Sequence, residues 1–432
     1  MSLKDRINRL TGETPKPVQA DPKQERISEL RKRIDEVMNR REHIAPAVVP
    51  QPRSGSIPLE RVVAGEEVAT EHGRFFCSRS TLAGSDSHGH SRVSDLACLS
   101  MDTAAFLAGS QALMGFSLED GLFLDTETTG LAGGTGTFPF LIGLGWFENG
   151  SFVTSQLFAR DFSEERSMLA FLSGLASAKR FLVTFNGRAY DINLLSSRYI
   201  LNRSEDVLFG MPHIDLLHPS RRMLAHRLEN ARLVTIEAHV LGVRREDDVP
   251  GYEIPQRYFD WLRRRDGRLM EDVFRHNRLD IVSMASLLKH LAGLVEGGHE
   301  MQGAHPGDLL CAARLHHDRG DLAAARRMLE PLKECTQPDI ALNARKSLSL
   351  IHKRSLQWDE AVSLWKDIIA MHPHDVFAIE ELAKWYEHHA REFGLAVELV
   401  QRVLDEDWHL GETERQSLEH RMKRLLHKMA LR

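Results

Sequence analysis

The chain has few cysteines and no long apolar segment, and each shortage argues against a class of protein. Its 432 residues include only four cysteines, none in a C-x-x-C pair, which argues against a disulfide framework and a zinc knuckle. The strongest apolar run, Phe138 to Phe147, is well short of the roughly 20 residues that cross a bilayer. The first ten residues mix charges where an exported protein carries an apolar signal segment. We therefore expect a cytoplasmic protein that does not bind membranes.

A large charge of one sign is also missing. The net charge is −5, and 27% charged with 42% hydrophobic residues is the balance of an ordinary globular protein. Nothing indicates an overall basic surface, so any contact with nucleic acid must come from a local patch.

Composition and periodicity divide the chain into four segments. Residues 1–58 combine a charged amphipathic helix with a Pro/Ser-rich linker, and residues 59–120 read as an irregular N-terminal extension of the next domain. Residues 121–296 alternate short apolar runs with helical patterns, which predicts an α/β domain with a mixed sheet flanked by helices. Residues 304–432 are helical in pattern.

The α/β segment allows individual elements to be predicted. Its apolar runs are rich in aromatic and β-branched residues, and a long helical stretch from Pro219 to Leu294 follows them, broken at Pro250. We expect strands at Gly121–Thr126, Phe138–Phe147, Phe152–Phe158 and Phe181–Phe185, and helices at Ser163–Ala178 and Asp191–Tyr199.

The carboxyl-terminal third contains a repeated pattern. Three helical segments align through Ala325, Ala361 and Ala396, which are 36 and 35 residues apart. This spacing is close to the period of about 34 residues in tetratricopeptide repeats, where a small residue lets paired helices pack closely. An all-α bundle without true repeats is the alternative. Repeats of this kind predict a binding surface for a protein partner.

The sharpest local signal is an acidic pair at the end of an apolar strand. Asp125 and Glu127 are two residues apart, so both side chains lie on one face of the strand. No lysine or arginine is adjacent in sequence, and hard oxygen ligands of this kind suit Mg²⁺ or Mn²⁺. A strand that ends in a polar turn explains the same residues about equally well.

Further acidic residues follow later in the chain. Asp191 stands where the chain leaves the strand at Phe181–Phe185 and begins a helix, and taken alone it reads as a helix cap. His276 and Asp280 are four residues apart on one helical face, and taken alone they read as a surface pair. Asp215 is a possible supporting acid, for which structural pairing is the simpler interpretation.

Taken together, these residues resemble a known set. The order D-x-E, N-G-x-x-x-D and H-x-x-x-D is similar to the three motifs of the DEDD, or DnaQ-like, 3′-to-5′ exonucleases of the ribonuclease H fold. The segment LFLDTETTGLAGGTGTFPFLIGLG, with HNRLD and a repeat-bearing carboxyl end, more closely resembles the YprB-type ribonuclease H-like proteins. The resemblance covers roughly Gly121 to Leu291.

The resemblance implies phosphodiester hydrolysis with two divalent ions, Mg²⁺ or Mn²⁺. Asp125, Glu127, Asp191 and Asp280 would be the metal ligands, and His276 would accept a proton from the attacking water. The substrate would be a single-stranded DNA or RNA end. The candidate substrate-binding residues are Thr128, Asn186 and Asn277, which belong to the same motifs.

One feature departs from the resemblance. The histidine subgroup of these exonucleases usually carries its histidine five residues before the last aspartate, whereas His276 is four residues before Asp280. The spacing therefore supports the metal-ligand roles of the carboxylates better than a general-base role for His276.

An arginine-rich segment offers a route for the substrate. Residues 221 to 278 contain 13 arginines and no lysine, and Tyr252, Tyr258 and Trp261 lie among them. Arginine pairs with phosphate and aromatic rings stack on bases, so a single-strand track is one interpretation. Solvated helix faces are the other.

Two rival functions remain at the level of sequence. A non-catalytic adaptor would bind nucleic acid through the α/β domain and recruit a protein through the repeats. A structure-specific endonuclease would use the same acidic residues on internal phosphodiester bonds.

Overall fold

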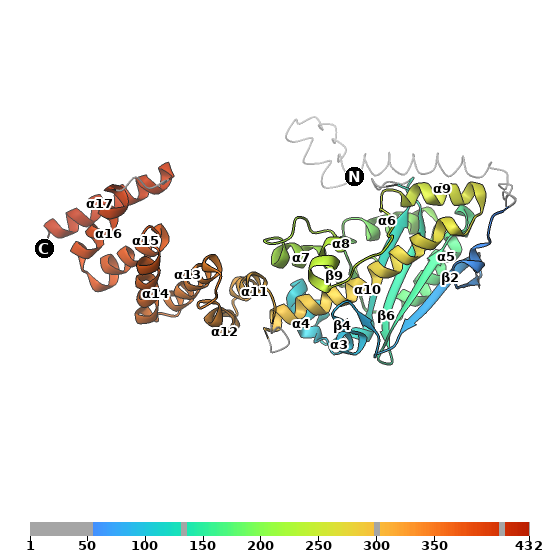
Figure 1. The fold of residues 1–432 in the computed structure, drawn as a ribbon, viewed down its shortest axis with the longest axis horizontal. Helices are drawn as coiled ribbons and strands as arrows, with labels where there is room; N and C mark the ends of the chain where they lie inside the picture. Colours follow the sequence, from blue (N-terminus) through green and yellow to red (C-terminus); the bar gives the residue numbers. More distant parts are fainter. Residues whose placement is uncertain (1–54, 131–135, 298–302, 406–410, 432) are drawn as a thin grey trace, which may run out of the picture.

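The computed structural model describes residues 55–130, 136–297, 303–405 and 411–431; most of the helix-and-linker segment expected at 1–58 falls outside these ranges. Figure 1 shows an elongated molecule, with a helix-covered sheet at one end and a row of helices extending from it. The two parts are an α/β domain and an all-helical region, which confirms the expected fold class.

A seven-stranded mixed sheet forms the centre of the α/β domain. The strand order is β1-β2-β7-β6-β5-β8-β9, in which β5 pairs in parallel with β8 and β8 with β9, while the other pairs are antiparallel. The strands are β1 (Glu66–Thr70), β2 (Gly73–Leu82), β5 (Gly121–Thr128), β6 (Pro139–Glu148), β7 (Ser151–Phe158), β8 (Phe181–Thr184) and β9 (His213–Asp215), and β3 (Ser87–His88) with β4 (Ser91–Arg92) makes a separate small hairpin.

The two faces of the sheet are buried by different helices. Leu124 of β5 belongs to the same core cluster as Met168 of α5 (Glu165–Ala176), near α6 (Asp191–Leu201). Phe123 belongs to the opposite cluster with Ile281 of α10 (Arg268–Glu296). Because side chains alternate along a strand, Asp125 shares the face of Phe123, which is the face that α10 covers.

Two glycines let α10 approach the sheet closely. A Cβ atom at Gly143 of β6 would lie 2.3 Å from Oδ1 of Asn277, and one at Gly145 would lie 2.5 Å from Cγ2 of Ile281. Contacts this short are sterically forbidden, so any larger residue at either position would push α10 away. The glycines thus place the middle of α10 directly above β6.

Residues 59–120, which we expected to be irregular, instead extend the sheet. Strand β2 pairs with β7 from Phe76 to Leu82, and β1 completes the edge. The signal was hidden because Phe75, Phe76 and Cys77 are consecutive buried residues, which breaks the alternation of a strand with one buried face. The rest of this segment contains α3 (Val93–Ala97), α4 (Met101–Ala108) and the 3₁₀ turns η1 (Leu59–Arg61), η2 (Gln111–Leu113) and η3 (Leu118–Asp120).

The helical stretch expected from Pro219 to Leu294 is interrupted three times, at residues 225–232, 242–253 and 265–267. A loop at 242–253 separates the π-helix η5 (Glu237–Leu241) from the next helix, because Gly242 ends η5 with a φ of 71°. The helical pieces are α7 (Leu217–Leu224), α8 (Leu233–Ile236), η5, α9 (Ile254–Arg264) and α10. A further 3₁₀ turn, η4 (Phe162–Glu164), precedes α5.

The carboxyl-terminal region consists of helices that pack on their neighbours in chain order. Ala325, Ala361 and Ala396, the aligned alanines, are fully buried in α12, α14 and α16. The helices are α11 (Pro306–Asp318), α12 (Leu322–Leu332), α13 (Pro338–Arg354), α14 (Trp358–Met371), α15 (Val376–Trp385), the π-helix η7 (Tyr386–Ala390), α16 (Phe393–Asp405) and α17 (Glu412–Ala430). Among the described residues, none of the helices has the length and apolar character to cross a membrane.

Candidate active site

Four carboxylates and one imidazole, carried by three elements, gather where β5 ends. Asp125 and Glu127 lie in the second half of β5, Asp191 is the first residue of α6, and Asp280 lies near the middle of α10. His276 is one turn before Asp280 on the same helix. One donor atom each from Glu127, His276 and Asp280 lie within 4.8 Å of one another. Glu127, His276 and Asp280 therefore meet in space, and Asp125 and Asp191 lie close enough to this group to interact with it electrostatically.

The electrostatics of the site reflect this crowding. Burial, followed by the charges of Asp280 and Asp191, raises the pKa of Asp125 well above its usual range. Burial and then the charge of Asp125 raise the pKa of Glu127 in the same direction. Burial also raises the pKa of Asp191 to about 6, although a hydrogen bond from Thr126 favours its charged form. A cation bound among these carboxyl groups would favour their ionised forms.

Asp191 is held by a short network at the start of α6. Thr126 on β5 donates its hydroxyl to Oδ1 of Asp191 at 2.5 Å. The loop that leads into α6 is fixed by Asp215, whose two carboxylate oxygens accept the backbone N–H groups of Asn186 at 2.8 Å and Arg188 at 3.1 Å. Asp215 is itself 8% exposed, so it organises this loop and stands behind the acidic group.

His276 is oriented by a carboxylate that sequence reasoning missed. Its Nδ1 lies 2.9 and 3.0 Å from the two oxygens of Asp248. Its Nε2 points the other way, 3.6 Å from Oδ2 of Asp280 and 3.9 Å from Oε1 of Glu127. Burial opposes the charge of Asp248, but the hydrogen bond from His276 and the charge of Arg245 lower its pKa.

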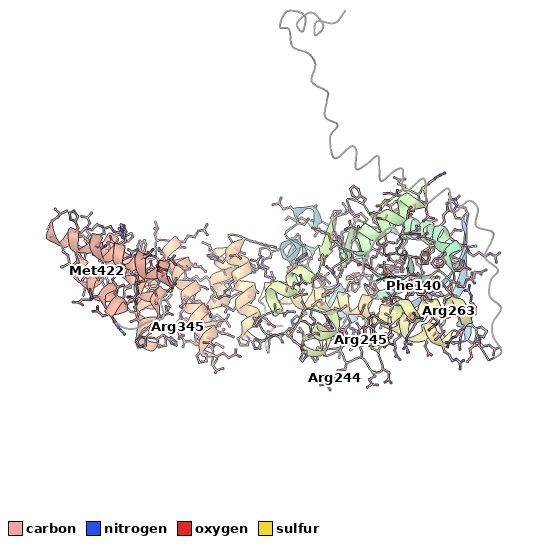
Figure 2. The ribbon with its side chains drawn as sticks, turned by 90° about the horizontal axis from the view of Figure 1, so that it is seen from above. Phe140, Arg244, Arg245, Arg263, Arg345 and Met422 are labelled. Carbon is pink, nitrogen blue, oxygen red and sulfur yellow. The ribbon has the colours of Figure 1, made fainter. Side chains whose placement is uncertain are left out.

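Arg245 is a second functional residue that sequence reasoning missed. It donates to both oxygens of Glu237 at 2.6 Å, and Glu237 is fully buried. The same guanidinium donates to Oδ1 of Asp280 and to Asp248. Figure 2 shows Arg244 at the edge of the domain and Arg245 further inside, which agrees with their exposure. Arg245 therefore neutralises part of the acidic group and ties the 242–253 loop to it.

Asn277 secures Asp125 from the side of α10. Its Nδ2 donates to Oδ2 of Asp125 at 2.9 Å, and its Oδ1 accepts from Gln156 at 3.0 Å. Asp125, Gly143 and Gln156 are cross-strand neighbours on β5, β6 and β7, so one row of the sheet supports both contacts. Asn277 is fully buried, which places it behind Asp125.

The other candidate substrate-binding residues differ in accessibility. Thr128 is buried and donates to the carbonyl of Gly130 at 2.8 Å, with the hydroxyl of Tyr190 3.1 Å away. Asn186 is exposed and adopts a positive φ of 67° at the turn before α6. Thr128 thus shapes the chain that follows β5, while Asn186 presents its side chain to solvent.

Two of the three aromatic residues in the arginine-rich segment belong to the core. Tyr258 is fully buried and its hydroxyl donates to the carbonyl of Ala159. Trp261 is 4% exposed and donates to the carbonyl of Arg160. Tyr252, at 71% exposure in the loop beside the site, is the one of the three that can meet a base.

Comparison with known proteins agrees with this geometry. Residues 122–292, which contain all four carboxylates and His276, match the family model of the RNase H superfamily. The chain therefore carries a domain of that superfamily. It is also 32% identical over 328 residues to the uncharacterized protein YprB of Bacillus subtilis (strain 168), covering 74% of this chain and 78% of that protein. The chain belongs to the family of YprB.

Proposed function

We propose that the chain is a metal-dependent nuclease, in the first instance a 3′-to-5′ exonuclease that hydrolyses phosphodiester bonds of DNA or RNA. The observation that carries this proposal is the meeting of Asp125, Glu127, Asp191 and Asp280 at one end of β5 in an RNase H superfamily domain. A domain that only binds polyanions has no use for this buried negative charge, which repels phosphate unless cations compensate it.

The residues present fit divalent cations. The donors are carboxylate oxygens, which suit Mg²⁺ and Mn²⁺, and the pKa values of Asp125 and Glu127 are raised by burial and by the charges of neighbouring carboxylates. Bound ions of this kind supply a nucleophilic water and neutralise charge on the phosphodiester. Asp125 would hold the ions between β5 and α10, while Asn277 fixes the rotamer of its carboxylate. Asp191 would reach them from α6.

A positively charged cleft beside the site supports a nucleic-acid substrate. The cleft, of about 370 Å³, lies between the α/β domain and α11, and its lining includes Arg188, Arg222 and Arg319. Burial, followed by the positive charge of Arg222, lowers the pKa of Arg319. Arg188 is three residues before Asp191, so this cleft adjoins the turn that presents the acidic group.

The carboxyl-terminal helices are proposed to be tetratricopeptide-like repeats that bind a protein partner. The support is the burial of three alanines at nearly equal spacing in α12, α14 and α16. In this proposal residues 121–296 form the nuclease domain, with 59–120 as its extension, and residues 304–432 form the repeat domain.

The test is an end-labelled degradation assay. Purified chain would be incubated with 5′-labelled single-stranded DNA and RNA in Mg²⁺, in Mn²⁺ and in EDTA, beside Asp125→Asn and Asp280→Asn. We expect stepwise shortening that needs the metal and disappears in both variants. The exposed Asp102→Asn, on α4, is the matched control and should keep full activity.

Three other outcomes of the degradation assay would change the proposal. Cleavage of circular substrates would favour the endonuclease. Intact substrate under every condition, with folded protein, would favour the adaptor. Full activity of Asp125→Asn would refute the assignment of the acidic residues.

A further inference from the structure

The hydrogen bonds of His276 determine which of its nitrogens carries the proton. Nδ1 lies within 3.0 Å of both oxygens of Asp248, and Asp248 is also bonded by Arg245. A carboxylate paired with a guanidinium accepts hydrogen bonds, so Nδ1 of His276 is the donor. Nη1 of Arg245 can also donate to Nδ1, at 3.2 Å, but the two contacts with Asp248 are shorter and favour Nδ1 as the donor. The lone pair of the neutral imidazole is therefore on Nε2.

This lone pair on Nε2 faces two carboxylate oxygens. When the carboxylates are ionised, neither oxygen carries a proton that it could donate to Nε2. Nε2 is 3.6 Å from Oδ2 of Asp280 and 3.9 Å from Oε1 of Glu127. These distances are too long for hydrogen bonds, but they are close to the separations between ligand atoms around one ion. Metal–ligand bonds of about 2.1 Å place two neighbouring ligand atoms roughly 3.0 Å apart around an octahedral ion such as Mn²⁺, and roughly 3.4 Å apart around a tetrahedral one.

We propose that His276 is a direct metal ligand through Nε2, together with Glu127 and Asp280, and that Asp248 is the positioning residue of this ligand. The inference rests on the proposed function and specifies the metal it uses. An imidazole nitrogen beside carboxylate oxygens favours a transition metal such as Mn²⁺ over Mg²⁺, which prefers oxygen ligands.

The surroundings of His276 match those of known metal-binding histidines. Such histidines donate their second ring N–H to a carboxylate or carbonyl, which fixes the ring and its tautomer. Asp248 does this for His276, and Arg245 anchors Asp248 from the buried Glu237. The four-residue spacing of His276 and Asp280 puts both side chains on one face of α10, as two ligands of one ion require.

A general base at His276 would use the same lone pair as a metal ligand. Measurements of metal binding distinguish these two roles. A base that acts on water leaves the affinity for metal unchanged when it is removed. A ligand contributes to affinity and leaves a nitrogen signature in the magnetic spectrum of bound Mn²⁺.

The experiment measures Mn²⁺ and Mg²⁺ binding by the full chain, without substrate. Electron spin-echo spectroscopy of bound Mn²⁺ should show coupling to ¹⁴N that changes when histidine is labelled with ¹⁵N. In His276→Gln the nitrogen coupling should vanish. Asp248→Asn should keep the coupling but bind Mn²⁺ about 10- to 100-fold more weakly, and His276→Gln should lose at least as much. Mg²⁺ affinity should change less in both.

A matched control and the labelled wild type keep the test decisive. His239→Gln changes an exposed histidine of η5 and should leave both affinities and the coupling unchanged. Wild-type protein that binds Mn²⁺ without nitrogen coupling would overturn the ligand role and leave the nuclease proposal standing. Wild-type protein that binds neither ion would overturn both.

Discussion

At the scale of single residues, the site depends on small side chains as much as on charged ones. A hydrogen bond from Asn277 fixes the carboxylate of Asp125. Asn277 is itself fixed by a hydrogen bond from Gln156 and by close packing against Gly143, which has no side chain. A close-packed contact of this kind transmits a displacement of one atom to the next.

Gly143→Ala should therefore impair both stability and activity. The added methyl would meet Oδ1 of Asn277 at 2.3 Å, and overpacking of this kind typically costs about 1–3 kcal/mol. Urea unfolding should show that loss, and turnover should fall because Asp125 is displaced. Gly174→Ala is the control: this exposed glycine of α5 has open space around its Cα, so the change should stabilise the helix slightly. Equal stability of the two variants would contradict the packing argument.

The raised pKa of Asp191 predicts an unusual dependence of stability on pH. The folded carboxyl titrates at about 6 and an unfolded one near 3.9, so between these values the folded state holds the extra proton. Its contribution to stability is therefore greatest at low pH and falls as pH rises through this window. Buried His213, with a pKa lowered to about 4 mainly by burial, acts in the opposite direction. A comparison with Asp191→Asn isolates the carboxyl.

The measurement is urea unfolding of the metal-free chain at pH 4 and at pH 7. Relative to Asp191→Asn, the wild type should lose up to about 3 kcal/mol between these pH values, because two pKa units correspond to that free energy. Added Mn²⁺ at pH 7 should restore the lost free energy of unfolding. Parallel pH profiles of the two proteins would contradict the prediction.

At the scale of elements, the loop at 242–253 completes the site that β5, α6 and α10 begin. Arg245 and Asp248 reach His276 and Asp280 from this loop, and the buried Glu237 holds Arg245 from η5. A buried ion pair that loses one partner leaves an uncompensated charge.

Glu237→Ala should loosen this loop. The free energy of unfolding should fall by about 3–5 kcal/mol, as for other broken buried pairs, and backbone amides of residues 242–253 should exchange faster. Mn²⁺ affinity should fall too, because Asp248 would no longer orient His276. Glu246→Gln, on an exposed residue of the same loop, should change none of these. Unchanged amide exchange in Glu237→Ala would show that Glu237 does not anchor the loop.

The same elements show what sequence could and could not provide. Strands β5 to β8 and helices α5 and α6 were predicted because their apolar periodicity is local. The acidic residues were found by their order along the chain. Arg245 and Asp248 were missed because their partners lie about 30 residues away, and because the loop that carries them was expected to be helical up to the break at Pro250. Only a folded backbone brings such residues together.

At the scale of the whole molecule, α10 connects the site to the helical region. Its first half carries His276 and Asp280, and the carbonyl of Val295 near its end accepts from His316 of α11 at 2.8 Å. A helix of 29 residues spans about 43 Å at 1.5 Å per residue. Because α10 packs against both the sheet and α11, these contacts hold α11 in a defined orientation relative to the site.

The ion pair between Arg227 and Asp308 should be the main polar tie of this junction. Arg227 follows α7, and its Nε and Nη2 donate to Asp308 of α11 at 2.8 and 2.7 Å. Asp308 is 1% exposed and the Arg227 side chain is 22% exposed, so Asp308→Ala leaves a partly buried guanidinium without its partner and should cost about 1–3 kcal/mol. Calorimetry should then show the helical region unfolding separately at a lower temperature.

The pair of Arg222 and Asp318 joins the same two parts and provides the matched control. Both side chains are about half exposed, so Asp318→Ala should cost less than about 1 kcal/mol. Asp308→Ala should keep its Mn²⁺ affinity, because the acidic residues lie in the part that stays folded. Arg319 of α11 helps to line the positively charged cleft described above. If α11 separates from the α/β domain in Asp308→Ala, binding of single-stranded nucleic acid should therefore weaken as well. Equal effects of the two substitutions would show that burial does not decide the strength of this junction.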